Sequence, residues 1–136
     1  MRIFRVIKAF GLVFGLVLLI GCGARTGQNC SFGALSVSPP TGSADHSALS
    51  PGNAQQFLAF GTNLPAGCMS TQSNLLNVTW SLSDVANAKI SNSQDATFGV
   101  ATCTNVAPTA ITVTATLDAS HNSGKTVTGT ALLMCK

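Results

Sequence analysis

Charged side chains are scarce in this sequence of 136 residues. Charged residues make up 8% of the chain, and all four acidic residues are aspartates because glutamate is absent. Soluble domains usually contain about 25% charged residues. Such a chain has no cluster of basic residues that would bind nucleic acid, no acidic tail and no charged coiled coil. It also offers few groups for proton transfer, so we expect a protein that is not an enzyme, needs no cofactor and binds no nucleic acid.

Large polar aromatic residues are almost missing as well. Tyrosine is absent and Trp80 is the single tryptophan. Glycan-binding surfaces usually present exposed rings of these two types. Trp80 lies in a run where apolar and polar residues alternate, so we expect it in the core rather than on a binding surface.

The N-terminal segment has the pattern of an export signal. Three positive residues precede an apolar run, Ala9–Ile20, that is shorter than the ~20 residues needed to span a bilayer. The run ends in Leu19-Ile20-Gly21-Cys22, which resembles the lipobox of bacterial lipoproteins. This resemblance implies that residues 1–21 are a cleaved signal peptide and that Cys22 carries the lipid. An uncleaved anchor, or an ordinary signal peptide followed by a chance cysteine, is the alternative.

The resemblance also implies a location in the bacterial cell envelope. Gly23 rather than aspartate follows the lipidated cysteine, which in Gram-negative lipoproteins favours the outer membrane or cell surface over the inner membrane. Basic and acidic side chains balance in residues 22–136, because the excess positive charge belongs to the signal segment. Membrane attachment would therefore come from lipid rather than from a charged surface.

Four further cysteines predict two disulfides in an exported chain: Cys30, Cys68, Cys103 and Cys135. A zinc site would need closely spaced pairs, and no two of these four lie close together in the sequence. We therefore expect no metal. Four cysteines allow three pairings, and their spacing alone does not choose among them.

The rest of the chain predicts an all-β domain over residues 34–136, preceded by a short tether at residues 22–33. Seven short runs with alternating apolar residues or β-forming composition are separated by turn signals, which favours a β-sandwich. The runs lie around Leu35–Val37, Gln56–Gly61, Val78–Ser83, Ile90, Phe98–Val100, Ile111–Leu117 and Val127–Leu133. Residues 41–53 are expected to be a turn-rich connection.

The order of short motifs resembles the group 2 bacterial immunoglobulin-like domains, which also occur in intimin- and invasin-type surface proteins. The motifs are Leu35-Ser36-Val37-Ser38-Pro39, Pro51-Gly52, Gln56–Gly61, Val78-Thr79-Trp80-Ser81 with Ser83-Asp84, Ile111–Ala115 and Gly129–Leu133. The resemblance implies an immunoglobulin-like (Ig-like) β-sandwich of about seven strands. In that fold Cys30 and Cys68 would lie at one end and Cys103 and Cys135 at the other, which suggests the pairs Cys30–Cys68 and Cys103–Cys135.

Candidate catalytic groups are few and lie in predicted loops. Ser120 and His121 follow Asp118, and His46 follows Asp45, but neighbouring loop residues rarely have the aligned geometry of a catalytic triad. The aspartates form no D-x-D run of the kind that calcium sites favour. We expect these side chains to be solvated.

The sequence therefore favours a lipid-anchored, non-catalytic module that acts in adhesion, surface architecture or protein–protein contact. Its partners would be the membrane, through the N-terminal lipid, and an unidentified envelope or surface protein. The alternative is an envelope lipoprotein that binds a small ligand or a glycan. The loops around Cys68 and His121, expected at the same end as Cys30, are the first candidate contact regions.

Overall fold

The computed structural model describes residues 30–68 and 73–136. Within these residues the regular structure is nine β-strands and one short 3-10 turn, Ala119–His121. The described part contains no helix of sufficient length and apolarity to cross a membrane. The apolar run 9–20 and Cys22 lie outside the described residues, so signal cleavage and lipidation stay predictions.

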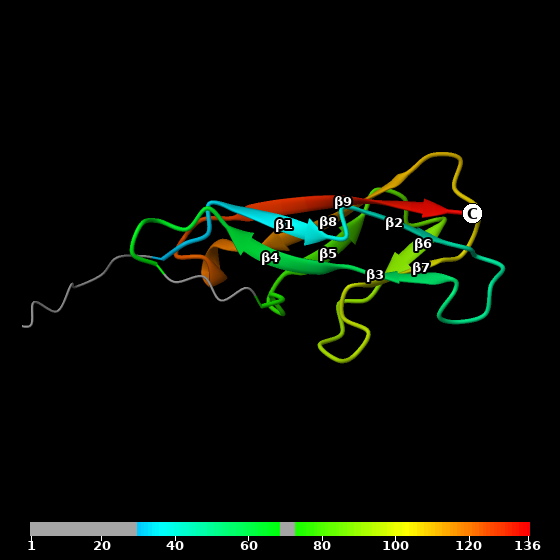
Figure 1. Cartoon of the computed structure of the whole chain (residues 1–136), viewed down its shortest axis with the longest axis horizontal. Coiled ribbons are helices and arrows are strands. Elements are labelled where there is room, and N and C mark those ends of the chain that lie inside the picture. The colour runs from blue at the N-terminus through cyan, green and yellow to red at the C-terminus, as the bar shows by residue number, and fades with distance from the viewer. Residues whose placement is uncertain (1–29, 69–72) are drawn as a thin grey trace, which may run out of the picture.

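The strands form three sheets (Figure 1). The four-stranded sheet has the order β2 (Thr41–Ala44), β9 (Val127–Cys135), β8 (Ile111–Leu117), β5 (Thr79–Leu82). The three-stranded sheet has the order β3 (Ala54–Gln56), β7 (Val100–Cys103), β6 (Ala88–Ile90). The third sheet pairs β1 (Ala34–Ser38) with β4 (Leu58–Thr62). Every pairing is antiparallel except that of β2 with β9, which is parallel.

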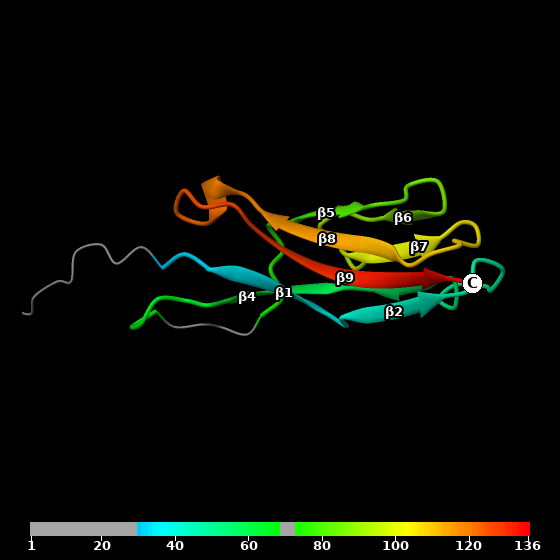
Figure 2. The same ribbon diagram turned by 90° about the horizontal axis from the view of Figure 1, so that it is seen from above.

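The sheets enclose one hydrophobic core, so the all-β prediction is confirmed and the arrangement is sandwich-like. β8 and β9 each contribute one face to this core. Along the whole length of both strands buried positions alternate with more exposed ones, which is the period of a strand with one face inward. Figure 2 shows β5 and β6 along one side of the molecule and β2 on the opposite side. The largest fully buried side chains come from both layers: Phe57, Cys103, Ile111, Val113, Leu117 and Leu133.

The strand count differs from the seven expected, because one expected run is divided in two and a further strand, β2, lies in a segment expected to be a connection. Pro39-Pro40 ends β1, as proline cannot donate to a strand ladder. However, the Pro40 carbonyl accepts a hydrogen bond from the Leu132 N–H at 3.0 Å, and the chain crosses there to the other sheet. Residues 41–44 are therefore a strand paired with β9, and the prediction of a turn-rich connection over all of 41–53 is wrong.

The expected run Gln56–Gly61 is divided at Phe57. The Phe57 N–H makes a last hydrogen bond on this side, to the Gly99 carbonyl at 2.9 Å just beyond the final β3–β7 pair, and the chain then leaves β7. It then continues as β4 beside β1. Phe57 and Ala59 are both fully buried, so alternate residues of this run face the core.

Both disulfides have the expected pairing, Cys30–Cys68 and Cys103–Cys135. Cys103 and Cys135 are the last residues of β7 and β9, and their bridge joins the three-stranded sheet to the four-stranded one. Both are buried. Cys30 is exposed and precedes β1, at the opposite end of the molecule from Cys135 (Figure 1).

Candidate functional site

One concave feature of the described residues is a groove between the edge strands β5 and β6. It has a volume of about 480 Å³. Apolar side chains dominate its lining, and polar groups stand at its margin: Trp80, Leu82, Val85, Ala88 and Ile90, with Ser81, Lys89 and Asn92. β5 is the edge strand of the four-stranded sheet and β6 is the edge strand of the three-stranded sheet, so the groove lies between the two layers of the sandwich.

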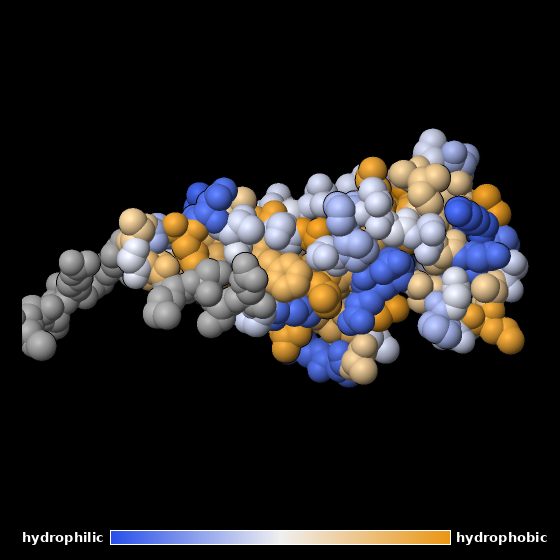
Figure 3. All heavy atoms as spheres, in the orientation of Figure 1, coloured by the Kyte–Doolittle hydropathy of each residue, from blue (hydrophilic) through white to orange (hydrophobic). Residues whose placement is uncertain are grey.

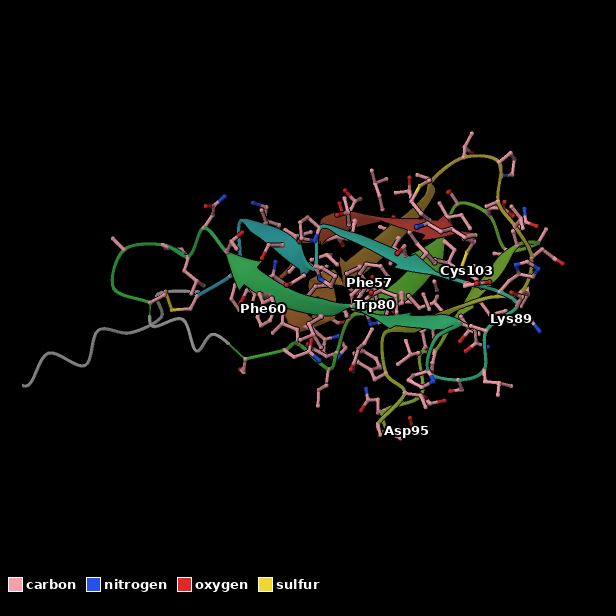
Figure 4. The ribbon with its side chains drawn as sticks, turned by 45° about the vertical axis from the view of Figure 1, so that its right-hand side comes forward. Phe57, Phe60, Trp80, Lys89, Asp95 and Cys103 are labelled. Carbon is pink, nitrogen blue, oxygen red and sulfur yellow. A yellow bond between two sulfur atoms is a disulfide. The ribbon has the colours of Figure 1, made fainter. Side chains whose placement is uncertain are left out.

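Trp80 belongs to the core, as predicted. It is 2% exposed and packs edge-on against Phe98, with ring centroids 6.3 Å apart. Figure 4 shows Trp80 beside Phe57 in the centre of the molecule. The Trp80 Nε1 atom is buried and has no hydrogen-bond acceptor among the described residues. A buried indole N–H normally finds a partner, so this donor is an exception within the core.

A side chain occupies the open edge of β5 at Trp80. The Trp80 N–H donates to Asn92 Oδ1 at 2.7 Å, and Asn92 Nδ2 donates to the Trp80 carbonyl at 3.0 Å. Gln94 Nε2 likewise donates to the Leu76 carbonyl at 2.9 Å. The segment that follows β6 therefore satisfies the Trp80 backbone as a neighbouring strand would, and it also bonds the chain before β5.

A second hollow, of about 400 Å³, lies on the outer face of the three-stranded sheet. Polar residues such as Ser91, Thr97 and Thr102 line it together with apolar Ala54, Ile90 and Val100. Lys89 lines both this hollow and the groove. The exposed middle residue of β6 thus stands between the two concave surfaces, and Figure 4 shows it away from the central core.

Three loops expose aliphatic side chains at the end where β9 finishes. Leu49 is 90% exposed, Val85 77% and Val106 57%. Hydrogen bonds hold two of these loops together, as Asn105 Nδ2 donates to the Ala86 carbonyl at 3.1 Å. In Figure 3 hydrophobic residues reach the surface among hydrophilic ones at this end of the molecule.

The two histidines lie far apart and in different surroundings. His46 follows β2, and its Nδ1 lies 2.6 Å from the Lys136 carbonyl oxygen and 3.9 Å from Asp45 Oδ1. His121 is at the other end, where its Nδ1 lies 3.2 Å from the hydroxyl of exposed Ser120. His121 forms no ion pair with a carboxylate within the described residues.

The aspartates near turns hold their own loops. Asp45 Oδ1 accepts from the hydroxyl and the N–H of Ser47, Asp95 Oδ1 does the same with Thr97, and Asp84 accepts from Asn87. These hydrogen bonds, chiefly the side-chain ones, favour the ionised forms and lower the pKa of all three carboxyls. They are turn-forming groups rather than a shared site. Among the described residues no three His, Cys, Asp or Glu side chains cluster as metal ligands would.

The predicted contact loops do lie together at the Cys30 end. The Cys30–Cys68 bridge fixes one of them beside the start of β1. The other is held by Asn122, which is 2% exposed. Its side chain accepts from the Phe32 N–H at 2.6 Å and donates to the Phe32 carbonyl at 3.1 Å. Residues 69–72 of the first loop lie outside the described part.

Sequence reasoning missed the groove. Only a weak signal points to it, namely Lys89 between apolar Ala88 and Ile90 in a three-residue strand. Comparison of the chain with protein-family models and with curated proteins finds no match.

Proposed function

We propose that this protein is a lipid-anchored, non-catalytic Ig-like module of the bacterial cell envelope. It would be held at the outer membrane or cell surface by lipid on Cys22 and act in adhesion, surface architecture or protein–protein contact. The Cys30–Cys68 disulfide carries the proposal, because it closes the domain shortly after the lipobox. Disulfides persist in compartments outside the cytoplasm, which is where a lipobox would direct the chain.

The strand order supports the Ig-like part of the proposal. Constant-type Ig domains place strands A, B, E and D in one sheet and C, F and G in the other. Here β1, β4 with β3, β7 and β6 follow the first order, and β5, β8 and β9 follow the second. β2 then extends the first strand into the opposite sheet beside β9.

The separation of the reactive side chains supports a non-catalytic role. His46 and His121 lie at opposite ends, and the aspartates with hydrogen-bonded carboxyls each serve a local turn. Catalytic sites instead bring nucleophile, base and orienting group within hydrogen-bond reach of one another.

The geometry suggests how the module would stand at a membrane. A tether over residues 23–29 would reach at most about 25 Å when extended. It would enter at the Cys30 end, so the loops with Leu49, Val85 and Val106 would point away from the membrane. These exposed aliphatic residues, together with the β5–β6 groove, are the surfaces that an envelope partner would meet.

The alternative function, binding of a small ligand or glycan, draws support from the groove volume. The aromatic content weighs against the glycan, because Trp80 is buried and tyrosine is absent. Contact with a protein is therefore the function that these surfaces favour.

Fractionation of cells that express the full chain tests the anchor. We expect the unmodified protein in the membrane fraction and Cys22→Ser in the soluble extracytoplasmic fraction. Cys30→Ser is the matched control, because it removes a cysteine near the lipobox but leaves Cys22, and it should stay with membranes. A Cys22→Ser variant that fractionates as the unmodified protein does would overturn the proposal.

A further inference from the structure

The outer face of the described four-stranded sheet consists of uncharged side chains. Residues that pair directly opposite one another share a face of a sheet, so the register identifies the members of this face. They are Thr41 and Ser43 in β2, Thr128, Thr130, Leu132 and Met134 in β9, Thr112, Thr114 and Thr116 in β8, and Thr79 and Ser81 in β5. All of these residues are exposed or half-buried. Hydroxyl and apolar groups therefore make up the whole face.

The surrounding surface makes this composition informative. The charged residues that the structure describes all lie outside the four strands of this sheet. A solvated surface usually intersperses charges of both signs, whereas depletion of charged residues and enrichment of methionine mark the core of a protein–protein interface. Leu132 and Met134 are 43% and 44% exposed on this face. The face thus has the composition of a contact surface.

The hydroxyl groups of the face are arranged so that they can pair with an identical set. Thr116 lies opposite both Thr79 and Thr128, and Thr114 lies opposite both Ser81 and Thr130, which gives two rows of three hydroxyl side chains across the sheet. These six hydroxyls form no hydrogen bond with another residue of the described part. A hydroxyl is both a donor and an acceptor. A second copy of the face would therefore offer acceptors to its donors and donors to its acceptors, which a face of lysines or of aspartates would not do.

The area of the face suits a reversible contact between two copies. The four strands have 9, 7, 4 and 4 residues. At about 3.4 Å per residue and about 4.8 Å per strand they cover roughly 400 Å² when drawn flat, and protruding side chains add to the accessible area. Standard interfaces bury about 800 Å² per partner and transient ones bury less. The face is therefore large enough for a dimer that forms and separates.

The direction of the face suits two molecules anchored in one membrane. Figure 2 shows β9 and β8 along the long axis of the molecule, with β2 on one side and β5 on the other. Cys30 lies at one end of this axis (Figure 1). A two-fold axis parallel to the strands would bring the two faces together with both Cys30 ends on the same side. Attachment to one membrane would also raise the local concentration of the two faces, which favours a contact of this size.

We propose that this protein self-associates through the outer face of the β2–β9–β8–β5 sheet, with a second copy of the chain as the partner. The two sheets pack face to face and their side chains interdigitate, as the layers of a sandwich do. The contact is isologous, so it closes as a dimer. This inference rests on the proposed contact function and names the partner.

Sedimentation equilibrium of the full chain in detergent, over a series of protein concentrations, tests the inference. We expect the unmodified chain to shift from monomer to dimer as the concentration rises. Thr114→Lys places a charge at the centre of the face, where it would meet the same charge of the second copy, and should weaken association at least about tenfold. Thr102→Lys is the matched control, because Thr102 is also half-buried in the central strand of a sheet but lines the hollow on the other sheet, and it should associate as the unmodified chain does.

Mixing of charged variants separates a lost contact from a lost fold. Thr114→Glu alone should weaken association as Thr114→Lys does. An equal mixture of the two variants should recover the dimer, because opposite charges then meet in the contact. A variant that fails to fold would not recover on mixing. Two lipid anchors that share a micelle would raise the mass of every variant alike, so this effect does not mimic the expected pattern.

A chain that stays monomeric at every concentration, equal association of the unmodified chain and Thr114→Lys, or a mixture that stays monomeric would overturn the inference. Assemblies that grow beyond the dimer would also overturn it, because an isologous contact closes. Failure here is separable from failure of the proposed function. A monomeric chain that still fractionates with membranes would contradict the self-association alone, and a dimer with an unlipidated Cys22 would contradict the anchor alone.

Discussion

The fold requires a glycine at position 99. Its φ is +76°, in the left-handed region that favours glycine. A Cβ there would overlap the Phe57 carbonyl oxygen and lie 3.3 Å from the Trp80 ring. The Phe57 carbonyl and the Gly99 carbonyl both lie at the junction between β3 and β4. A side chain at position 99 would therefore push the segments at this junction apart.

Gly99→Ala should therefore destabilise the domain by more than its backbone strain alone. Gly124→Ala is the control, because Gly124 has a similar φ of +86° but open space around its Cβ position. We expect a cost of about 1 kcal/mol for Gly124→Ala and about 2–4 kcal/mol for Gly99→Ala. Urea unfolding followed by Trp80 fluorescence measures both, and equal costs would contradict the predicted overlap.

The hydrogen-bonded aspartates predict an acid-dependent loss of stability. Turn hydrogen bonds lower the pKa of Asp45, Asp84 and Asp95 in the folded state. A carboxyl with a lowered folded pKa stabilises the fold fully above its unfolded pKa of about 3.9. That stabilisation is lost as the pH falls through the folded pKa.

The urea concentration at the midpoint of unfolding should therefore stay constant between pH 7 and pH 5 and fall between about pH 4 and pH 2. Asp84→Asn removes one contributor and should flatten the decline, since asparagine does not titrate. A midpoint that is unchanged at pH 2 would show that these turns contribute nothing to the pH dependence.

At the scale of elements, the two disulfides should differ in their response to reduction. Cys103 and Cys135 are 2% and 3% exposed and join two sheets, whereas Cys30 is exposed and Cys68 is half-buried. A mild reductant should open Cys30–Cys68 first. Alkylation of the free thiols followed by peptide mapping shows the order in which the two disulfides are reduced. Reduction of Cys103–Cys135 first would contradict the prediction.

Removal of the bridges should also cost different amounts. Each closes a loop of 32 to 38 residues, worth roughly 3–4 kcal/mol by loss of unfolded-state entropy. The double variant Cys103→Ala/Cys135→Ala should cost more than Cys30→Ala/Cys68→Ala, because it also empties buried volume between the sheets. Urea unfolding measures both free energies, and equal losses would show that the core repacks fully.

The elements differ in how far the sequence determines them. β8 and β9 were predictable because their alternation runs through seven and nine residues. β3 and β6 have three residues each, too few for a period to stand out. β2 was missed because its Thr41-Gly42-Ser43-Ala44 composition is that of a turn, and only its pairing with β9 makes it a strand.

At the scale of the whole molecule, the disulfide pairing was predictable and the candidate site was not. The pairing depends on which end of the fold each cysteine reaches, and the order of the strands determines that. The groove depends on how β5 and β6, which lie on different sheets, are placed relative to each other, and on the Asn92 side chain that bonds the Trp80 backbone. No local sequence pattern encodes that arrangement.

The central claim is that the chain is exported, lipidated at Cys22 and closed by two disulfides. Intact mass spectrometry and non-reducing peptide mapping of the protein from its native membrane test it most directly. The account predicts a chain that starts at acylated Cys22 and yields linked Cys30–Cys68 and Cys103–Cys135 peptides. An unacylated N-terminus would contradict the anchor, and free thiols or bridges joining the two ends would contradict the fold.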